Sequence, residues 1–250
     1  MTSKKNWTMR AAGLMLALVL ITSCFTGGTF AKYVTSGNGS DTARVAKFGV
    51  TVSVKNNTVF HTTYATKGDV LDKDGAKIEN SVVSDNGENL VAPGTKEEGT
   101  ATFSVTGTPE VAVNVKLALE PTDGNTEVKD VFLKAGTYDN YTTAATDDTF
   151  ELTNDYYPVK FTLKKGTEST TGTLADINAK LAALSKNYPA NTTLDDVLGE
   201  YTLSWEWAFE NNDAADTLLG NLAAGTAVVD AAKYSTQIAF KLTATVTQID

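Results

Sequence analysis

Histidine is the side chain that most often moves protons at neutral pH, and this chain contains only one. Any Ser-His-Asp triad or histidine-based metal site would therefore have to include His61. The sequence has no His-Glu-x-x-His zinc motif, no Gly-x-Ser-x-Gly nucleophile motif and no glycine-rich nucleotide-binding motif. We therefore expect a protein that is not an enzyme and that requires no cofactor.

Adjacent carboxylates are the next groups that could do chemistry, because paired acids hydrolyse glycosidic bonds. Asp147-Asp148 and Asp195-Asp196 are such pairs. The first pair lies in a polar stretch, and the second lies at the start of an expected helix, where acidic side chains interact favourably with the helix dipole. These positions favour a structural role for both pairs.

Asp213 and Asp216 are weak candidates for calcium ligands, because loops rich in side-chain oxygens bind this ion. Their spacing does not match an EF-hand loop. Asp213 also suits the N-cap of a helix, and Asp216 suits the partner position of a capping box. The structural interpretation is favoured, and no metal site is expected.

Trp205 and Trp207 alternate with other residues, so both indoles point to the same face of an expected strand. Such a pair could form an aromatic platform for a sugar or part of a hydrophobic core. Leu203 and Phe209 fall on the same face and favour the core.

The first 31 residues have the order of a secretory signal peptide. Three basic residues precede an apolar run from 11 to 23, which is too short to anchor the chain stably across a bilayer. A small-residue cleavage site follows at Thr29-Phe30-Ala31. We expect a signal peptidase to cut after Ala31, so that the mature chain starts at Lys32 and meets the membrane only during export.

A second processing route stays open. The stretch from Ile21 to Cys24 resembles a lipoprotein box, in which the cysteine is lipidated and becomes the first residue. Cys24 is the only cysteine, so a chain cut after Ala31 has none. Such a chain can form neither disulfides nor thiolate metal sites.

The chain is strongly acidic. Its formal net charge is −9, and loss of the three basic residues of the leader lowers this to −12. Because such a charge repels phosphate backbones, nucleic acid is not expected as a partner. We expect a secreted protein, extracellular or attached to the cell wall, whose partners are other subunits, cations or basic surfaces.

Alternation of apolar and polar residues, which is typical of half-buried strands, recurs along the rest of the chain. The clearest example covers 111–119. Further strands are expected at 44–55, 58–64, 78–83, 101–105, 128–133, 156–163, 201–209 and 236–249. The turn Gly107-Thr108-Pro109 predicts a hairpin between 101–105 and 111–119, and the stretch 136–149 is expected to be a surface loop.

Helices are expected to interrupt this pattern. Residues 173–187 carry leucine and isoleucine at spacings of three and four, and Thr173 can cap the start. Short helices are also expected at 193–198 and 213–222, with a helical turn at 227–233.

Antiparallel strands that each bury one face favour two packed sheets, and no βαβ rhythm is found. We predict an all-β fold, an antiparallel jelly-roll-like β-sandwich with two or three short inserted helices. The expected domains are a signal peptide at 1–31, a flexible polar arm at 32–43 and a single β-sandwich domain at 44–250.

Two segments carry a family resemblance. Residues 27–52, GGTFAKYVTSGNGSDTARVAKFGVTV, resemble the processing region of exported TasA/camelysin-like surface and biofilm-matrix proteins of Gram-positive bacteria. Residues 201–221, YTLSWEWAFENNDAADTLLGN, in which a Trp-x-Trp strand precedes Asp-x-x-Asp-Thr-x-Leu-Gly, are similar to related surface proteins. Together the two segments cover under a fifth of the chain.

The resemblance implies a jelly-roll subunit of extracellular fibres in a biofilm matrix, where the N-terminal segment of one subunit completes the sheet of the next. The assembly arm would then start with Lys32, Tyr33, Val34 and Thr35, and the partners would be further copies and other matrix proteins. Camelysin-type members have also been classed as metallopeptidases, an activity that the single histidine does not support. The alternative function is a monomeric cell-surface binding module for a glycan or a host ligand.

Overall fold

The computed structural model describes residues 44–55, 59–141, 148–209 and 212–249. The chain divides into two compact units between Lys47 and Phe48, and the description below concerns the second unit. The expected signal peptide, its cleavage site and the arm at 32–43 lie outside the described residues. Within the described ranges, no helix is both long and apolar enough to cross a membrane.

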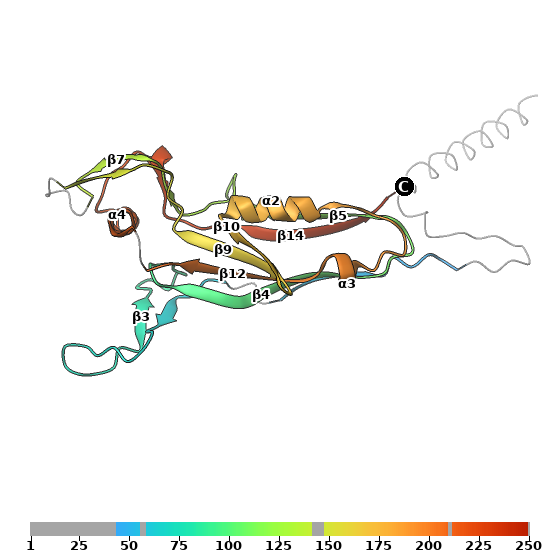
Figure 1. Cartoon of the computed structure of the whole chain (residues 1–250), viewed down its shortest axis with the longest axis horizontal. Helices are drawn as coiled ribbons and strands as arrows, with labels where there is room; N and C mark the ends of the chain where they lie inside the picture. Colours follow the sequence, from blue (N-terminus) through green and yellow to red (C-terminus); the bar gives the residue numbers. More distant parts are fainter. Residues whose placement is uncertain (1–43, 56–58, 142–147, 210–211, 250) are drawn as a thin grey trace, which may run out of the picture. The chain divides into compact units, whose positions relative to one another are not determined.

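Two antiparallel sheets form the body of this unit (Figure 1). The larger sheet joins, in order, β1 (Val50–Lys55), β4 (Lys96–Gly107), β12 (Gly199–Trp207), β9 (Val159–Lys165) and β10 (Glu168–Gly172). The smaller sheet joins β11 (Lys186–Tyr188), β5 (Val113–Glu120) and β14 (Lys241–Gln248). All neighbouring strands in both sheets are antiparallel. The predicted β-sandwich with short helical inserts is confirmed.

The core lies between the facing surfaces of these sheets. In β5 every second residue is apolar and buried, because alternate side chains of a strand point to opposite faces. β12 repeats this pattern. Trp205 and Phe161 are among the largest fully buried side chains, and the ring of Phe240 meets that of Phe161 edge-on at 5.9 Å. Each such side chain contributes about 1.5–3 kcal/mol by leaving water, so this interior dominates the stability.

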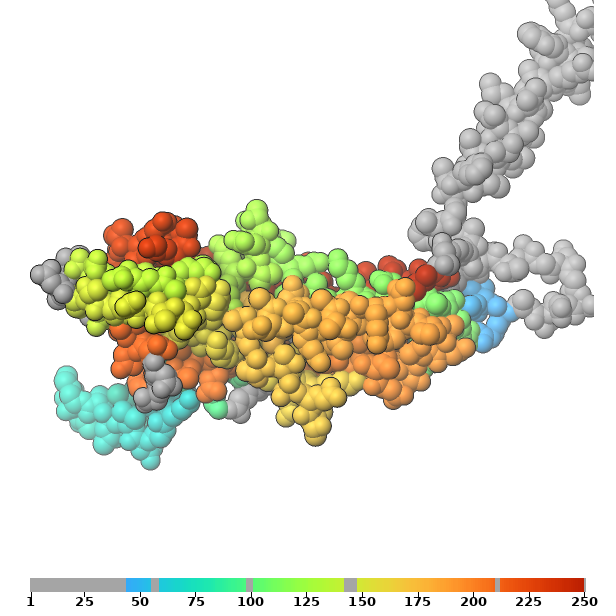
Figure 2. Space-filling model, turned by 45° about the horizontal axis from the view of Figure 1, so that its top comes forward, coloured from blue at the N-terminus to red at the C-terminus, as the bar shows by residue number. Residues whose placement is uncertain are grey.

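Helix α2 (Leu174–Leu184) packs against β5, β9 and β10, as its spacing of apolar residues predicts. Figure 2 shows α2 in orange on the near face of the molecule. Thr173 Oγ1 accepts the N–H of Asp176, and the Asp176 carboxylate accepts the N–H of Thr173, which makes a capping box. Ile177 and Leu181 are fully buried.

Short elements extend from the body of the sandwich. The paired strands are β2 (Thr63–Ala65) with β3 (Asn80–Val83), β6 (Phe132–Leu133) with β13 (Tyr234–Ser235), and β7 (Gly136–Asp139) with β8 (Thr149–Leu152). Among the described residues, the further helices are α3 (Leu194–Val197), α4 (Asp213–Ala223) and the 3-10 turn η2 (Ala231–Lys233). The surface loop expected at 136–149 is partly wrong, because Tyr138 is buried and stacks on Phe150 across β7 and β8.

The hairpin expected between 101–105 and 111–119 is wrong. β4 pairs with β1 and β12 in the larger sheet, whereas β5 pairs with β11 and β14 in the smaller sheet. The turn Gly107-Thr108-Pro109 therefore carries the chain from one layer to the other. A turn sequence specifies a reversal of direction but not the next pairing partner, and two strands with one apolar face each can pack face to face across a core.

Several strands are shorter than the alternation predicts. The strand expected at 44–55 begins only at Val50, after Gly49 with a φ of 54°. The strand expected at 58–64 is reduced to β2, and that expected at 236–249 begins at Lys241. Phe209, expected on the buried face with Trp205, is 70% exposed because β12 ends at Trp207. Alternation reports which residues are apolar, not where the hydrogen-bonded ladder stops.

Gly107 is expected to be intolerant of a side chain. Its φ is 112°, and a Cβ at this position would overlap the backbone oxygen of Gly49. Gly124, with a φ of 87° and open space around it, is the matched control. Gly107→Ala should lower the free energy of unfolding by more than about 2 kcal/mol, and Gly124→Ala by about 1 kcal/mol from left-handed strain alone. Urea unfolding followed by tryptophan fluorescence measures both, and equal losses would contradict the overlap.

Candidate functional site

The inward face of β1 is only partly covered. Val52 and Val54 lie opposite Val105 and Phe103 of β4, so all four side chains point into the sandwich. Val105 and Phe103 are 1% and 2% exposed, whereas Val52 and Val54 are 41% and 46% exposed. The smaller sheet therefore ends before it reaches β1.

β14 is the strand at which the smaller sheet ends. It pairs with β5 from Lys241 to Gln248, and no other described strand pairs with it along this length. Its inward residues Leu242, Ala244 and Val246 are half-buried, although their partners on β5 are fully buried. The free edge of β14 thus runs beside apolar side chains that are incompletely covered.

An apolar hollow of about 460 Å³ separates β14 from β1 and β4. Val54 and Phe103 line it from the larger sheet, and Phe240 and Leu242 line it from the opposite layer. We call this hollow the edge groove. It suits an extended chain segment, because β14 offers main-chain hydrogen bonds while the valine and leucine side chains offer apolar contact.

His61 occupies a structural position. Its Nε2 lies 2.8 Å from Glu97 Oε2, and its ring meets that of Tyr64 edge-on at 5.9 Å. The Tyr64 hydroxyl donates to the carbonyl of Leu90 at 2.8 Å. In the part of the chain that the structure describes, no three His, Cys, Asp or Glu side chains gather closely enough to hold a metal ion.

Trp205 and Trp207 belong to the core, as their flanking residues predict. They are 2% and 5% exposed. The Trp205 indole N–H donates to the carbonyl of Val59, and its ring contacts those of Phe60 and Tyr64. A sugar cannot stack on buried indoles, so this pair is not an aromatic platform.

Asp216 joins α4 to the larger sheet. Its Oδ1 accepts the Tyr156 hydroxyl at 2.8 Å and the Trp207 indole N–H at 3.3 Å. Burial raises the pKa of the Asp216 carboxyl above its ordinary value, and the two hydrogen bonds only partly oppose this. Burial, with the same carboxylate beside it, also raises the pKa of the Tyr156 phenol.

The capping box expected at Asp213 and Asp216 is wrong. Asn212 is the N-cap of α4, Asp213 is the first helical residue, and no side chain makes a capping hydrogen bond. The Asp216 carboxylate interacts with Tyr156 and Trp207 instead of reaching back to the helix start. This arrangement explains Asp216 as a structural residue without a calcium ion.

The described residues of the two acidic pairs also occupy structural positions. Asp195 and Asp196 lie in the first turn of α3, as predicted, and Asp195 Oδ2 accepts the N–H of Gly107 at 2.7 Å. The carbonyl of Asp148 accepts the N–H of Asn140, and Asp147 lies outside the described residues.

The sequence did not predict the edge groove, because Val52 and Val54 alternate with polar residues just as fully covered strand residues do.

The Asp216 junction predicts a pH-dependent stability. A carboxyl whose pKa is raised on folding adds stability at pH values below its unfolded pKa, and this contribution is lost as pH rises through the raised pKa. Asp216→Asn keeps the acceptor oxygen and removes the charge. The unfolding free energy of the wild type minus that of the variant should therefore fall as pH rises from about 4 toward neutrality. Urea titrations across this range measure it, and a difference that grows with pH would refute the assignment.

Comparisons of this chain with known proteins found no relative. No family model matches the chain, and neither does any curated protein or solved structure. The resemblance of residues 27–52 and 201–221 to TasA/camelysin-like proteins therefore stays a prediction. The described residues themselves establish a β-sandwich with an open groove at one edge.

Proposed function

We propose that this chain is an exported structural subunit that self-associates into extracellular fibres or matrix by strand addition at the edge groove. The observation that carries the proposal is the half-exposed pair Val52 and Val54 on the inward face of β1, of which Val54 lines the edge groove together with Leu242 of β14. Added strands are a common way for proteins to bind an extended segment through its main chain. The signal-peptide pattern of the first 31 residues supports export.

The proposed occupant of the groove is the segment 32–43 of a second copy. The eight residues of β14 span roughly 26 Å at about 3.3 Å each, and the twelve residues of the segment reach about 40 Å when extended. The segment is therefore long enough to pair with the whole of β14, of which Lys241 and Leu242 line the edge groove. Either Tyr33 or Val34 would enter the groove, because neighbours in a strand face opposite sides. Main-chain hydrogen bonds would supply most of the remaining attraction, since the segment is otherwise polar.

The incoming strand should pair with β14 rather than with β1. Pairing with β14 places the strand in the smaller sheet, opposite the inward face of β1, where it would cover Val54 in the edge groove and Val52 further along β1. Pairing with the outer edge of β1 would extend the larger sheet and leave both valines exposed. Covering the exposed halves of Val52 and Val54 would contribute roughly 2 kcal/mol to the free energy of binding, which favours pairing with β14 over pairing with β1. The family resemblance of residues 27–52 points to the same mode of assembly.

The proposal predicts that protein starting at Lys32 forms filaments visible by negative-stain electron microscopy, and that protein starting at Arg44 stays monomeric in sedimentation. Val54→Glu should also abolish filaments, because a carboxylate in the groove would be desolvated by the incoming strand. Val83→Glu, which changes a 61% exposed valine on β3, is the matched control and should leave assembly intact.

Mixing the two proteins that should not form filaments tests the arm and the groove separately. The Val54→Glu protein retains an arm, and the protein starting at Arg44 retains a groove, so together they should form a discrete complex of two chains but no filament. Filaments from the protein lacking residues 32–43 would overturn the proposal. A wild-type protein that stays monomeric from Lys32 would favour the monomeric binding module instead.

A further inference from the structure

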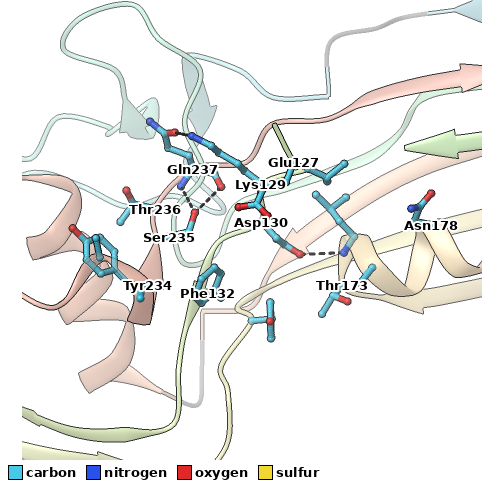
Figure 3. Close-up of a pocket in the computed structure, with 16 residues that line it drawn as sticks. Glu127, Lys129, Asp130, Phe132, Thr173, Asn178, Tyr234, Ser235, Thr236 and Gln237 are labelled. Carbon is cyan, nitrogen blue, oxygen red and sulfur yellow. Dashed lines mark hydrogen bonds between the residues drawn. The ribbon is translucent and has the colours of Figure 1, made fainter. Parts of the chain in front are cut away.

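A second hollow, of about 860 Å³, lies at the start of α2. Its walls come from Tyr157 and from three segments that are distant in sequence, namely 127–132, 173–178 and 231–237. Figure 3 shows Thr173 and Asn178 on the α2 side, with Lys129 and Gln237 across from them. We call this hollow the α2 pocket. Its volume falls within the range of about 300–1,000 Å³ that is common for small-molecule sites.

One part of the wall is aromatic. Phe132 and Tyr157 both line the α2 pocket, and their ring centroids are 5.8 Å apart. Both side chains are half-buried, in contrast to the fully enclosed indole of Trp205. The Lys134 ammonium lies over the Phe132 ring, 5.1 Å from its centroid, so a ligand would stack on the aromatic surface that this ammonium does not cover.

Two amide side chains are held with their oxygen atoms already engaged. Asn178 Oδ1 accepts the N–H of Leu119 at 2.9 Å, and Gln237 Oε1 accepts the Lys129 ammonium at 2.9 Å. Figure 3 shows the second of these bonds as a dashed line. The orientation of each amide is therefore fixed, and each of these lining residues keeps an NH₂ group that can donate.

The charges of the α2 pocket disfavour an anionic ligand. Glu127 and Asp130 both contribute carboxyl groups to its lining, and the ammonium of Lys129 is already hydrogen-bonded to Gln237. The N–H of Leu174, in the first turn of α2, donates to Asp130 Oδ2 at 3.0 Å and is not available to a ligand. These groups argue against an anionic ligand, and they are compatible with a neutral ligand that has apolar faces and hydroxyl groups.

We propose that the α2 pocket binds a neutral oligosaccharide. A pyranose ring has a C–H face that stacks on aromatic rings such as Phe132, and hydroxyl groups that accept from amide N–H and donate to carboxylates. The pocket supplies both kinds of partner around one space. This inference is independent of the edge groove, which lies on other strands and needs no sugar.

The test is isothermal titration of the protein starting at Lys32 with cellotetraose and with chitotetraose, which separate plain hexoses from N-acetylated ones. We expect one of the two to bind with a dissociation constant between about 10 μM and 1 mM. Tetragalacturonate should bind at least about tenfold more weakly, because Glu127 and Asp130 repel its carboxylates.

The variants are chosen to preserve the fold. Asn178→Asp and Gln237→Glu each keep the engaged oxygen and remove the NH₂ donor, and each should weaken binding by about tenfold. Phe132→Ala should do the same by removing the stacking surface. Phe209→Ala removes a 70% exposed ring outside the pocket and should leave affinity unchanged.

Three results would overturn the proposal. The first is no heat of binding from either neutral tetramer at about 10 mM. The second is equal affinity of the Phe132→Ala, Phe209→Ala and wild-type proteins. The third is tetragalacturonate binding as tightly as the neutral probes. Circular dichroism of each variant confirms that a loss of affinity is not a loss of fold.

Discussion

A sheet with one apolar face must have that face covered, and the two layers that cover each other in this protein differ in width. The smaller sheet and α2 cover the inward faces of β9, β10, β12 and β4. The cover ends at β14, so Val52 and Val54 stay partly exposed, and this part of β1 is held mainly by its ladder with β4. This mismatch creates the edge groove. The proposed assembly therefore uses a fold that is one strand short, and it requires no dedicated catalytic or metal-binding machinery.

Periodicity predicted those parts of the fold in which burial and secondary structure coincide. Alternation located β5 and β12, and spacings of three and four located α2 with Thr173 as its cap. Periodicity did not predict which strands pair, because no residue pattern near Gly107 distinguishes a β-hairpin from a connection between the two sheets. It also failed at strand ends such as Phe209, where an apolar residue follows the last hydrogen-bonded position.

The sites were harder to predict than the fold. The sequence placed Trp205 in the core, and the structure agrees. The contact of His61 with Glu97 was not predicted, because the two residues are 36 positions apart. Val52 and Val54 carry no local sign of exposure, because what uncovers them is the width of a sheet built from distant residues. The α2 pocket has the same origin, since its walls come from four separate parts of the chain that meet only after folding. Single-sequence patterns describe neighbours along the chain, and both hollows are properties of neighbours in space.

The pairing of β14 with β5 also sets an order of events. A ribosome makes residues 32–43 before β1 and β5, and makes residues 241–248 long after all of them. The edge groove cannot exist until that late strand has crossed back to β5, a contact of large sequence separation that is slow to form. In the proposed assembly, an unfinished chain would therefore contain the donor segment but no acceptor groove. Two unfinished chains would then be unable to link to each other.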